Sequence, residues 1–283
     1  MNLDEETETL TQRMAKQTKN VHDKSDRLVN LKLAMILTSR ELYAEAISLF
    51  WPIYRELERL MEQHQSDDRL GLLYPLLPTL RRASKFERDM EFMVGESGVP
   101  ISELKNRRIN KKVIVSSDNG QEVEEETFSP PELQAYIDNL RRIAEENPVV
   151  LVAYISAMYG AIMAGGSIIQ RMVKRAFSLK SKEGVTMFDM DLANTSKFPN
   201  SKALRNEIKR IIDHDMNISP QEQDMILKEA PMVFVHNNTL VATAKDTPAF
   251  SRAWDKGTQY VLLGLVVPIL LSGLTYAVYF SRR

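Results

Sequence analysis

Residues 148–177 read PVVLVAYISAMYGAIMAGGSIIQRMVKRAF, and this stretch decides the fold. Pro148 suits the first turn of a helix, where its missing N–H is not needed. The stretch then runs without another proline to three basic residues (Arg171, Lys174 and Arg175), which suit a helix C-terminus. We therefore predict one long apolar helix, which starts at Asn147-Pro148 and around which the rest of the chain packs.

The middle of this predicted helix is built from small residues. Each interior glycine costs roughly 1 kcal/mol of helix stability relative to alanine, so a run of them needs a reason. Either something flat approaches the helix backbone, or the helix bends there, or the small side chains allow another helix to pack closely. The pattern alone leaves these interpretations open. The small residues are Gly160, Ala161, Ala164, Gly165, Gly166 and Ser167.

The composition excludes several classes of protein. The chain has 283 residues, 37 basic and 38 acidic, so it lacks the global basic excess that is typical of nucleic-acid binding. It contains no cysteine, which excludes disulfides, iron–sulfur clusters and thiol catalysis. Its acidic N-terminus, MNLDEETETL, is not a secretory signal. The length and the 14 methionines fit one large helical domain with an adaptable apolar interior.

Apolar residues at helical spacing predict a single all-α domain over residues 12–244, behind a flexible leader at 1–11. Residues 40–64 give the strongest such pattern and are expected to form core. Prolines break 70–83 into short turns. Ser219-Pro220 opens the last helix, with serine as its cap and proline in its first turn. The remaining helices are expected at 12–28, 85–94, 131–146 and 201–214.

Two polar insertions interrupt the domain, at about 98–130 and 181–199. In the first, a basic cluster at 105–112 precedes an Asp118-Asn119-Gly120 turn signal and an acidic run at 122–126. These residues are compatible with a small hairpin, but we predict a flexible, solvated loop. The other interpretation of the basic cluster is a surface for an acidic partner or for lipid.

The C-terminal stretch 260–280, YVLLGLVVPILLSGLTYAVYF, is apolar and uncharged. At about 1.5 Å per residue it spans roughly 30 Å, the thickness of a bilayer core. Tyrosines lie near both of its ends, where aromatic side chains anchor at the membrane interface. We therefore predict a transmembrane tail anchor behind a polar linker at 245–259, with the bulk of the protein on the cytosolic side.

A histidine on the first predicted helix is a candidate ligand. His22 is followed four residues later by Asp26, on the same helix face. A lone histidine on a helix is more often an ordinary surface or core residue. A ligating histidine commonly needs a carboxylate, carbonyl or water on its other ring nitrogen, and Asp26 offers the carboxylate.

Taken together, these segments resemble the haem (heme) oxygenase family, as a divergent, invertebrate-like member. The resemblance covers residues 12–244 outside the two insertions, together with the hydrophobic tail. It rests on KNVHDKSD at 19–26, on LVAYISAMYGAIMAGGSIIQ at 151–170, and on the run from Arg205 through Ser219-Pro220 to the FVHN stretch at 234–237. The family implies an all-α fold in which heme lies between a proximal helix around His22 and a distal helix around Gly165.

The resemblance also implies roles for single residues. His22 falls on the ligand of the heme iron, and Asp26 falls where the family usually has a glutamate that orients this histidine. Gly165 and Gly166 fall on the distal glycine pair, whose missing side chains let the backbone approach bound dioxygen. The other heme-site positions are Lys16, Ala161, Arg210, Phe234 and Asn237, with Arg210 as the partner of a heme propionate and Phe234 as a wall of the heme pocket.

This chain departs from the family at the distal motif. The family's Gly-Asp-Leu-Ser-Gly-Gly reads AIMAGG at 161–166 here. The family's distal aspartate holds water that delivers protons, and Ile162, which replaces it, has no acceptor to do so. Propionate binding is also thinner, because family lysines fall on Ala15, beside Lys16, and on Asn206. We therefore expect slow turnover or relaxed regiospecificity.

The resemblance implies an enzyme that opens heme to biliverdin, carbon monoxide and ferrous iron. Heme is then both substrate and cofactor, with dioxygen and with electrons from NADPH through a P450-type reductase. Biliverdin reductase and membrane lipid are the other expected partners, and nucleic acid is not one. The expected location is the cytosolic face of the endoplasmic reticulum membrane, or alternatively the mitochondrial outer membrane. The alternative functions are a heme-binding sensor or buffer with little ring opening, and a heme-free tail-anchored scaffold.

Overall fold

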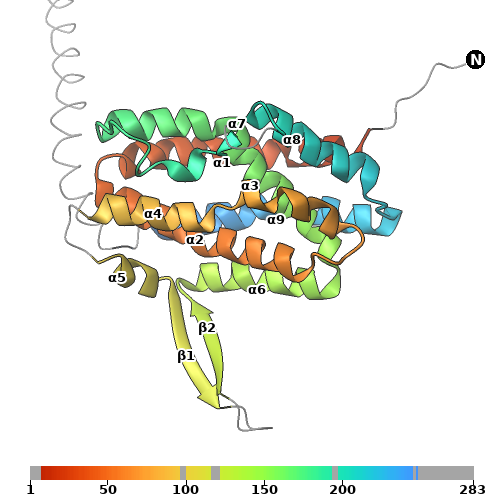
Figure 1. Cartoon of the computed structure of the whole chain (residues 1–283), viewed down its shortest axis with the longest axis horizontal. Helices are drawn as coiled ribbons and strands as arrows, with labels where there is room; N and C mark the ends of the chain where they lie inside the picture. The colour runs from red at the N-terminus through yellow and green to blue at the C-terminus, as the bar shows by residue number, and fades with distance from the viewer. Residues whose placement is uncertain (1–7, 96–99, 116–121, 193–196, 245–246, 248–283) are drawn as a thin grey trace, which may run out of the picture.

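The computed structural model describes residues 8–95, 100–115, 122–192, 197–244 and 247, with the backbone alone for 22–34, 114–115 and 122–123. Most of this described chain is helical (Figure 1), as the all-α prediction requires. The helices are α1 (Leu10–Ile36), α2 (Arg40–Gln63), α3 (Leu77–Leu80), α4 (Ala83–Val94), α5 (Ile101–Asn106), α6 (Pro131–Glu146), α7 (Val152–Ala176), α8 (Ser201–Arg210) and α9 (Pro220–Thr243). Shorter turns are η1 (Leu70–Leu76), η2 (Pro148–Leu151), η3 (Thr186–Phe188) and the π-helical η5 (Ile211–Asp215).

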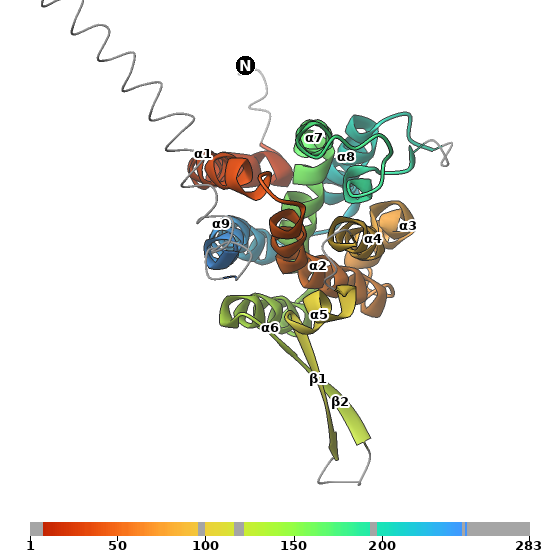
Figure 2. The ribbon, with the colours of Figure 1, turned by 90° about the vertical axis from the view of Figure 1, so that its left-hand side faces the viewer.

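The predicted core helix at 40–64 is confirmed as α2. Ser39 caps it by accepting a hydrogen bond from the Leu42 backbone N–H. Its apolar side chains recur at helical spacing, and Ile53 and Leu57 are fully buried. It packs against α4 and α6, so it lies at the centre of the bundle (Figure 2). Burial on this scale is the main source of stability for a helical domain.

The long apolar helix predicted at 148–177 is also present. The Asn147 side chain accepts from the Val149 N–H, η2 makes the first turn, and α7 continues to Ala176. Within the described chain, Pro148–Ala176 is the one helix long and apolar enough to cross a membrane. Its first half lies in the protein core, where Tyr154, Ile155 and Tyr159 have no exposed surface. The stretch is therefore a core helix. The predicted tail anchor at 260–280 and its linker lie outside the described residues, apart from Thr247.

The prediction of a flexible loop at 98–130 is wrong for the residues that the structure describes there. They form α5 and an antiparallel hairpin of β1 (Ile109–Val115) and β2 (Glu122–Phe128), which projects from the bundle (Figure 1). Ile109 pairs with Phe128, and both are buried at the base of the hairpin. Four members of the basic cluster form ion pairs within the chain, and of these Arg108 is buried whereas Lys111 is exposed: Arg108 with Glu45, Arg107 with Glu45 and Glu103, Lys105 with Glu87, and Lys111 with Glu124 and Glu126.

The described residues of the second insertion and of the leader (8–11) are also more ordered than predicted. Val185, Met187 and Met190 of the 181–199 insertion are buried in the core. At the N-terminus, α1 begins at Leu10, and the Thr11 hydroxyl and N–H both donate to Asp213, at 2.6 and 2.8 Å. The helix expected at 201–214 divides into α8 and η5. The predicted start of the last helix is confirmed by a full capping box at α9.

Candidate functional site

The second half of α7 leaves one of its faces uncovered. Ala161, Ala164 and Ile168 are exposed, Ile168 by 52%, and Ala157 and Gly165 are half-buried. At about 100° per residue these five positions fall on a single side of the helix, which we call the distal strip. The strip is apolar and carries almost no side-chain bulk before Ile168. A flat apolar group can therefore come close to the helix backbone along it.

The two adjacent glycines of α7 face different surroundings. A Cβ on Gly165 would meet nothing within 4 Å, so the space beside the strip is open there. A Cβ on Gly166 would lie 3.2 Å from Cδ1 of Phe188 and 3.4 Å from Cγ2 of Ile162, on the buried side of the helix. Of the predicted pair, Gly165 faces open space, and Gly166 faces the protein interior.

Helix α1 runs alongside α7 in both views of the fold (Figures 1 and 2). It carries the predicted ligand His22 and its partner Asp26, whose backbone is helical and whose side chains lie outside the described part. Lys16, one of the predicted heme-site residues, is largely exposed and forms an ion pair with Glu8 at 3.0 Å. The fold therefore brings the two predicted heme-facing helices side by side.

Helix α9 supplies two further predicted residues. Phe234 is half-buried against the core. Asn237 lies behind α7: its Nδ2 contacts the Met158 sulfur at 3.3 Å, and its Oδ1 accepts from the Tyr136 hydroxyl at 3.1 Å. The Tyr54 hydroxyl donates to the Met158 carbonyl oxygen at 3.0 Å, so α2, α6 and α9 all hold this turn of α7.

Sequence reasoning missed a polar cluster behind the same turn. Tyr154 donates to Glu229 at 2.5 Å and accepts from Asn139 at 2.7 Å, and His236 stacks on Tyr136 with ring centroids 4.9 Å apart. Burial raises the pKa of the Tyr136 and Tyr154 hydroxyls and lowers the pKa of His236, because charge is disfavoured away from water. Tyrosines inside apolar helix faces were the available signal, since a buried hydroxyl needs a partner.

Arg210 ends α8 and is already bound by carboxylates. It donates to Glu207 at 2.9 and 3.0 Å and to Asp215 at 2.7 Å. These acceptors raise the pKa of Arg210 and hold its exposed guanidinium at the surface. A propionate would have to share this side chain with two acids. Among the described residues, no group of three or more acidic or histidine side chains is arranged to hold a metal ion.

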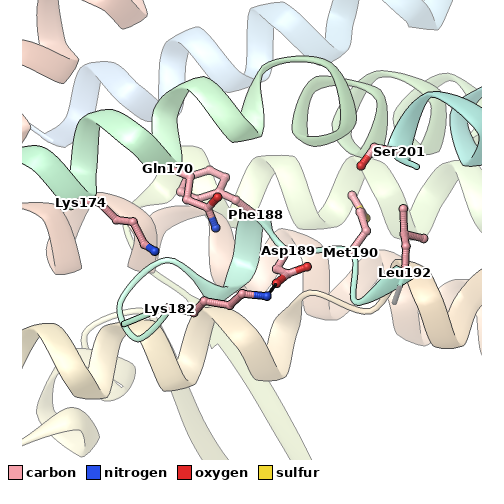
Figure 3. A pocket seen from close by; sticks show the side chains of 8 residues that line it. All are labelled: Gln170, Lys174, Lys182, Phe188, Asp189, Met190, Leu192 and Ser201. Atoms are coloured by element: carbon pink, nitrogen blue, oxygen red, sulfur yellow. Dashed lines mark hydrogen bonds and ion pairs between the residues drawn. The ribbon is translucent and has the colours of Figure 1, made fainter. Parts of the chain in front are cut away.

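A pocket of about 280 Å³ lies beside the C-terminal half of α7, away from the distal strip (Figure 3). Gln170 and Lys174 line it from α7, and Lys182, Phe188 and Asp189 line it from the segment that follows. Two of these lining residues, Lys182 and Asp189, form an ion pair at 2.5 Å. The pocket is small and partly polar, so it does not suit the same ligand as the distal strip.

Known proteins are similar to this chain over most of its length. The model of the Heme oxygenase family matches residues 8–123 and 99–243, two overlapping stretches. The chain is 21% identical to Heme oxygenase 2 of Synechocystis sp. over 238 residues, 84% of this chain and 83% of that one. Two solved structures share the fold, each with a TM-score of 0.68. They are heme oxygenase 2 from Chlamydomonas reinhardtii without heme (24% identity, 83% of this chain and 97% of that chain) and heme oxygenase-1 from Synechocystis in complex with heme (19% identity, 90% and 100%).

Proposed function

Because this chain belongs to the heme oxygenase family, we propose that it binds heme between α1 and α7 and opens the ring oxidatively. The products would be biliverdin, carbon monoxide and ferrous iron. The reaction would consume dioxygen and electrons from NADPH, delivered by a P450-type reductase. Biliverdin reductase is the partner that would take up the product.

The distal strip is the observation that carries this proposal. Ala157, Ala161, Ala164 and Gly165 leave a flat apolar surface on α7, opposite the side that is packed into the core. A porphyrin face is flat and apolar, and it gains stability when such a surface is removed from water. The residues that are present on this face therefore fit a heme ring.

We assign the remaining roles by position in the family motif. His22, from the stretch at 19–26, would bind the iron as a neutral imidazole, and Asp26 would orient its ring. Arg210 and Lys16 would pair with the propionates, in competition with their present acidic partners. Phe234 would wall the heme, and Asn237 would take the place of the family's pocket asparagine, where its Nδ2 contacts the Met158 sulfur.

Bound heme supplies the iron centre at which dioxygen is activated, and the protein supplies orientation and exclusion of water. Ile162 stands where the family has a proton-delivering aspartate, and its side chain packs towards Gly166 rather than accepting a hydrogen bond. Protons must then come from water held at backbone groups near Gly165. We expect slower turnover than in relatives with the aspartate, together with mixed biliverdin isomers.

The second candidate function is a heme-binding sensor or buffer with little ring opening. It is favoured by Ile162 itself, which is partly buried against the apolar core and has no polar atom in its side chain to hold water. Membrane attachment at the cytosolic face of the endoplasmic reticulum remains our proposal for location, with the mitochondrial outer membrane as the alternative. The apolar stretch at 260–280 supports both.

The test uses the full chain in detergent micelles, titrated with hemin and then supplied with NADPH and a P450-type reductase under air. Loss of the Soret band with growth of biliverdin, both abolished in His22→Ala, is the expected result. A stable Soret band that shifts in His22→Ala but never bleaches would favour the binding protein. No Soret band in the wild-type chain would refute both functions. A second variant, Arg210→Ala, tests the propionate contact by its effect on hemin binding. Its matched control is Arg142→Ala, because each variant removes an exposed arginine paired with a helix carboxylate.

A further inference from the structure

The segment that follows α7 is clamped to α4 by buried charged groups. Asp89, which has no exposed surface, accepts from the Thr186 N–H, the Thr186 hydroxyl and the Met187 N–H, each at 2.8 Å. Arg82 is 1% exposed and donates to the Met187 and Asp189 carbonyl oxygens. Four of these five bonds satisfy backbone groups of the segment, and the fifth satisfies the Thr186 hydroxyl. The path of residues 186–189 is therefore fixed by α4.

A second cation, Lys85 on α4, binds the far end of the same segment. Lys85 donates to the Asp189 carbonyl oxygen and forms an ion pair with Asp191 at 2.5 Å. Asp191 has a φ of 50°, a conformation that few non-glycine residues adopt without support. The clamp therefore holds the segment on both sides of Phe188.

Phe188 is the side chain that this clamp presses against α7. Figure 3 shows its ring under the helix, next to Gln170. Its Cδ1 lies 3.2 Å from where a Cβ of Gly166 would be, closer than an ordinary van der Waals contact. Any side chain at position 166 would have to displace either the ring or the helix. Gly166 therefore leaves room for Phe188, on the side of α7 that faces away from the distal strip.

We propose that Phe188 is a positioning residue. Through its contact with Gly166, it determines the distance between the distal strip of α7 and the bound ligand. This inference rests on the proposed heme site. The two glycines then have separate tasks: Gly165 leaves room for the ligand, and Gly166 leaves room for Phe188. The half-buried ring is held in place by the segment on both of its sides and contacts α7, so we expect a change at the ring to alter the position of the strip on the other side of the helix.

Three glycine-to-alanine variants on the same helix test the proposal. Gly160→Ala is the matched control, because a Cβ there meets nothing within 4 Å and the position lies off the distal strip. It should raise the melting temperature slightly, as expected when alanine replaces a helical glycine. Gly165→Ala should do the same to the ligand-free chain but weaken hemin binding at least about tenfold. Gly166→Ala should lower the melting temperature by roughly 5 °C, because the added methyl group displaces the Phe188 ring or the helix.

Phe188→Ala provides the converse change. In the ligand-free full chain we expect backbone amides 161–170 to exchange with deuterium about tenfold faster, while those of α2 are unaffected. With hemin and reductase, the same variant should change the ratio of biliverdin isomers. The double variant Gly166→Ala/Phe188→Leu should recover most of the melting temperature lost in Gly166→Ala, because the shorter leucine makes room for the methyl group.

The outcomes separate this inference from the proposed function. Absence of a Soret band in the wild-type chain overturns the heme site, whereas melting and exchange of the ligand-free chain decide the contact between Phe188 and α7. The contact is refuted if Gly166→Ala has the same melting temperature as Gly160→Ala. It is also refuted if adding Phe188→Leu to Gly166→Ala does not raise the melting temperature. If the wild type turns over and Phe188→Ala changes exchange but not the isomer ratio, the contact is structural and the positioning role is wrong.

Discussion

Removing the Asp89 carboxylate should destabilise the fold and release the segment that carries Phe188. Asp89→Ala deletes three hydrogen bonds of 2.8 Å to a fully buried acceptor. Bonds to a charged acceptor are worth about 1.5–3 kcal/mol each, and a buried orphan amide costs about 1–3 kcal/mol. The cost of burying the carboxylate offsets part of this, and the three bonds are not additive. We therefore expect a loss of about 3 kcal/mol, which lowers the melting temperature by roughly 6–12 °C.

The assay is thermal unfolding followed by far-ultraviolet circular dichroism at pH 7. Glu87→Ala is the control, because Glu87 lies on the same helix and its partly exposed pair with Lys105, at 3.2 Å, is worth about 0–1 kcal/mol. Asp89→Asn keeps one acceptor oxygen and should fall between the alanine variant and the wild type. A melting temperature for Asp89→Ala within about 2 °C of the Glu87→Ala value would refute the reasoning.

The difference in stability between the wild type and Asp89→Ala should depend on pH, and the sign of this dependence follows from the pKa of Asp89. Burial raises the pKa of Asp89 above its usual 3.8, although the bonds from Met187 and Thr186 oppose the shift. The native state then binds a proton at a higher pH than the unfolded chain does. The wild type should therefore gain stability relative to Asp89→Ala as the pH falls through the raised pKa towards 3.8. If the difference in stability between the wild type and Asp89→Ala becomes smaller on acidification, the pKa of Asp89 is not raised in the folded state.

Three further variants probe the site from other sides. Asn237→Leu leaves the buried Tyr136 hydroxyl without its 3.1 Å acceptor and should cost about 1–3 kcal/mol in chemical denaturation, with the exposed Gln221→Leu on the same helix as control. His236→Phe keeps the stacking on Tyr136 but removes a group whose pKa is lowered by burial. Wild-type stability should therefore fall as the pH drops below about 6.5, and this fall should be smaller in the variant. Arg210→Ala should leave the melting temperature unchanged, because the side chain is exposed, yet weaken hemin binding about tenfold relative to Arg142→Ala.

Elements with local signals were predictable from the sequence. The helix at 131–146 has proline in its first turn and an apolar face that repeats every three or four residues, so its ends agree with α6. The Ser219 and Glu222 capping box needs only residues three apart. The hairpin, by contrast, was not predicted, because contacts between residues far apart in the sequence stabilise it. Its strands are stabilised by Arg55 bound to Glu126 and by Arg108 bound to Glu45, contacts across 71 and 63 residues that no local pattern reveals.

The candidate site divides in the same way. The run of small residues that supplies most of the distal strip was visible in the sequence, although Gly160, Gly166 and Ser167 of that run fall off the strip. The polar cluster was not, because Tyr136 and Asn237 are 101 residues apart and meet only when α6 packs on α9. The contact of Phe188 with Gly166 depends on an irregular segment whose path is set by α4. Sequence analysis treated that segment as a polar insertion, although its methionines and Phe188 were the clue to burial.

The side chains behind α7 affect whether an aspartate restored at position 162 could hold water. Ile162 and Phe188 both approach the position where a Cβ of Gly166 would be, so the helix is backed by apolar side chains at that turn. An aspartate at position 162 would meet the same apolar surroundings, and a carboxyl group that is buried without partners has a raised pKa. Ile162→Asp alone should therefore hold water poorly and give little increase in ring opening. Combining it with Phe188→Ser would supply a hydroxyl partner and room for water. A full recovery of turnover in the single variant would show that Phe188 does not restrict this turn of the helix.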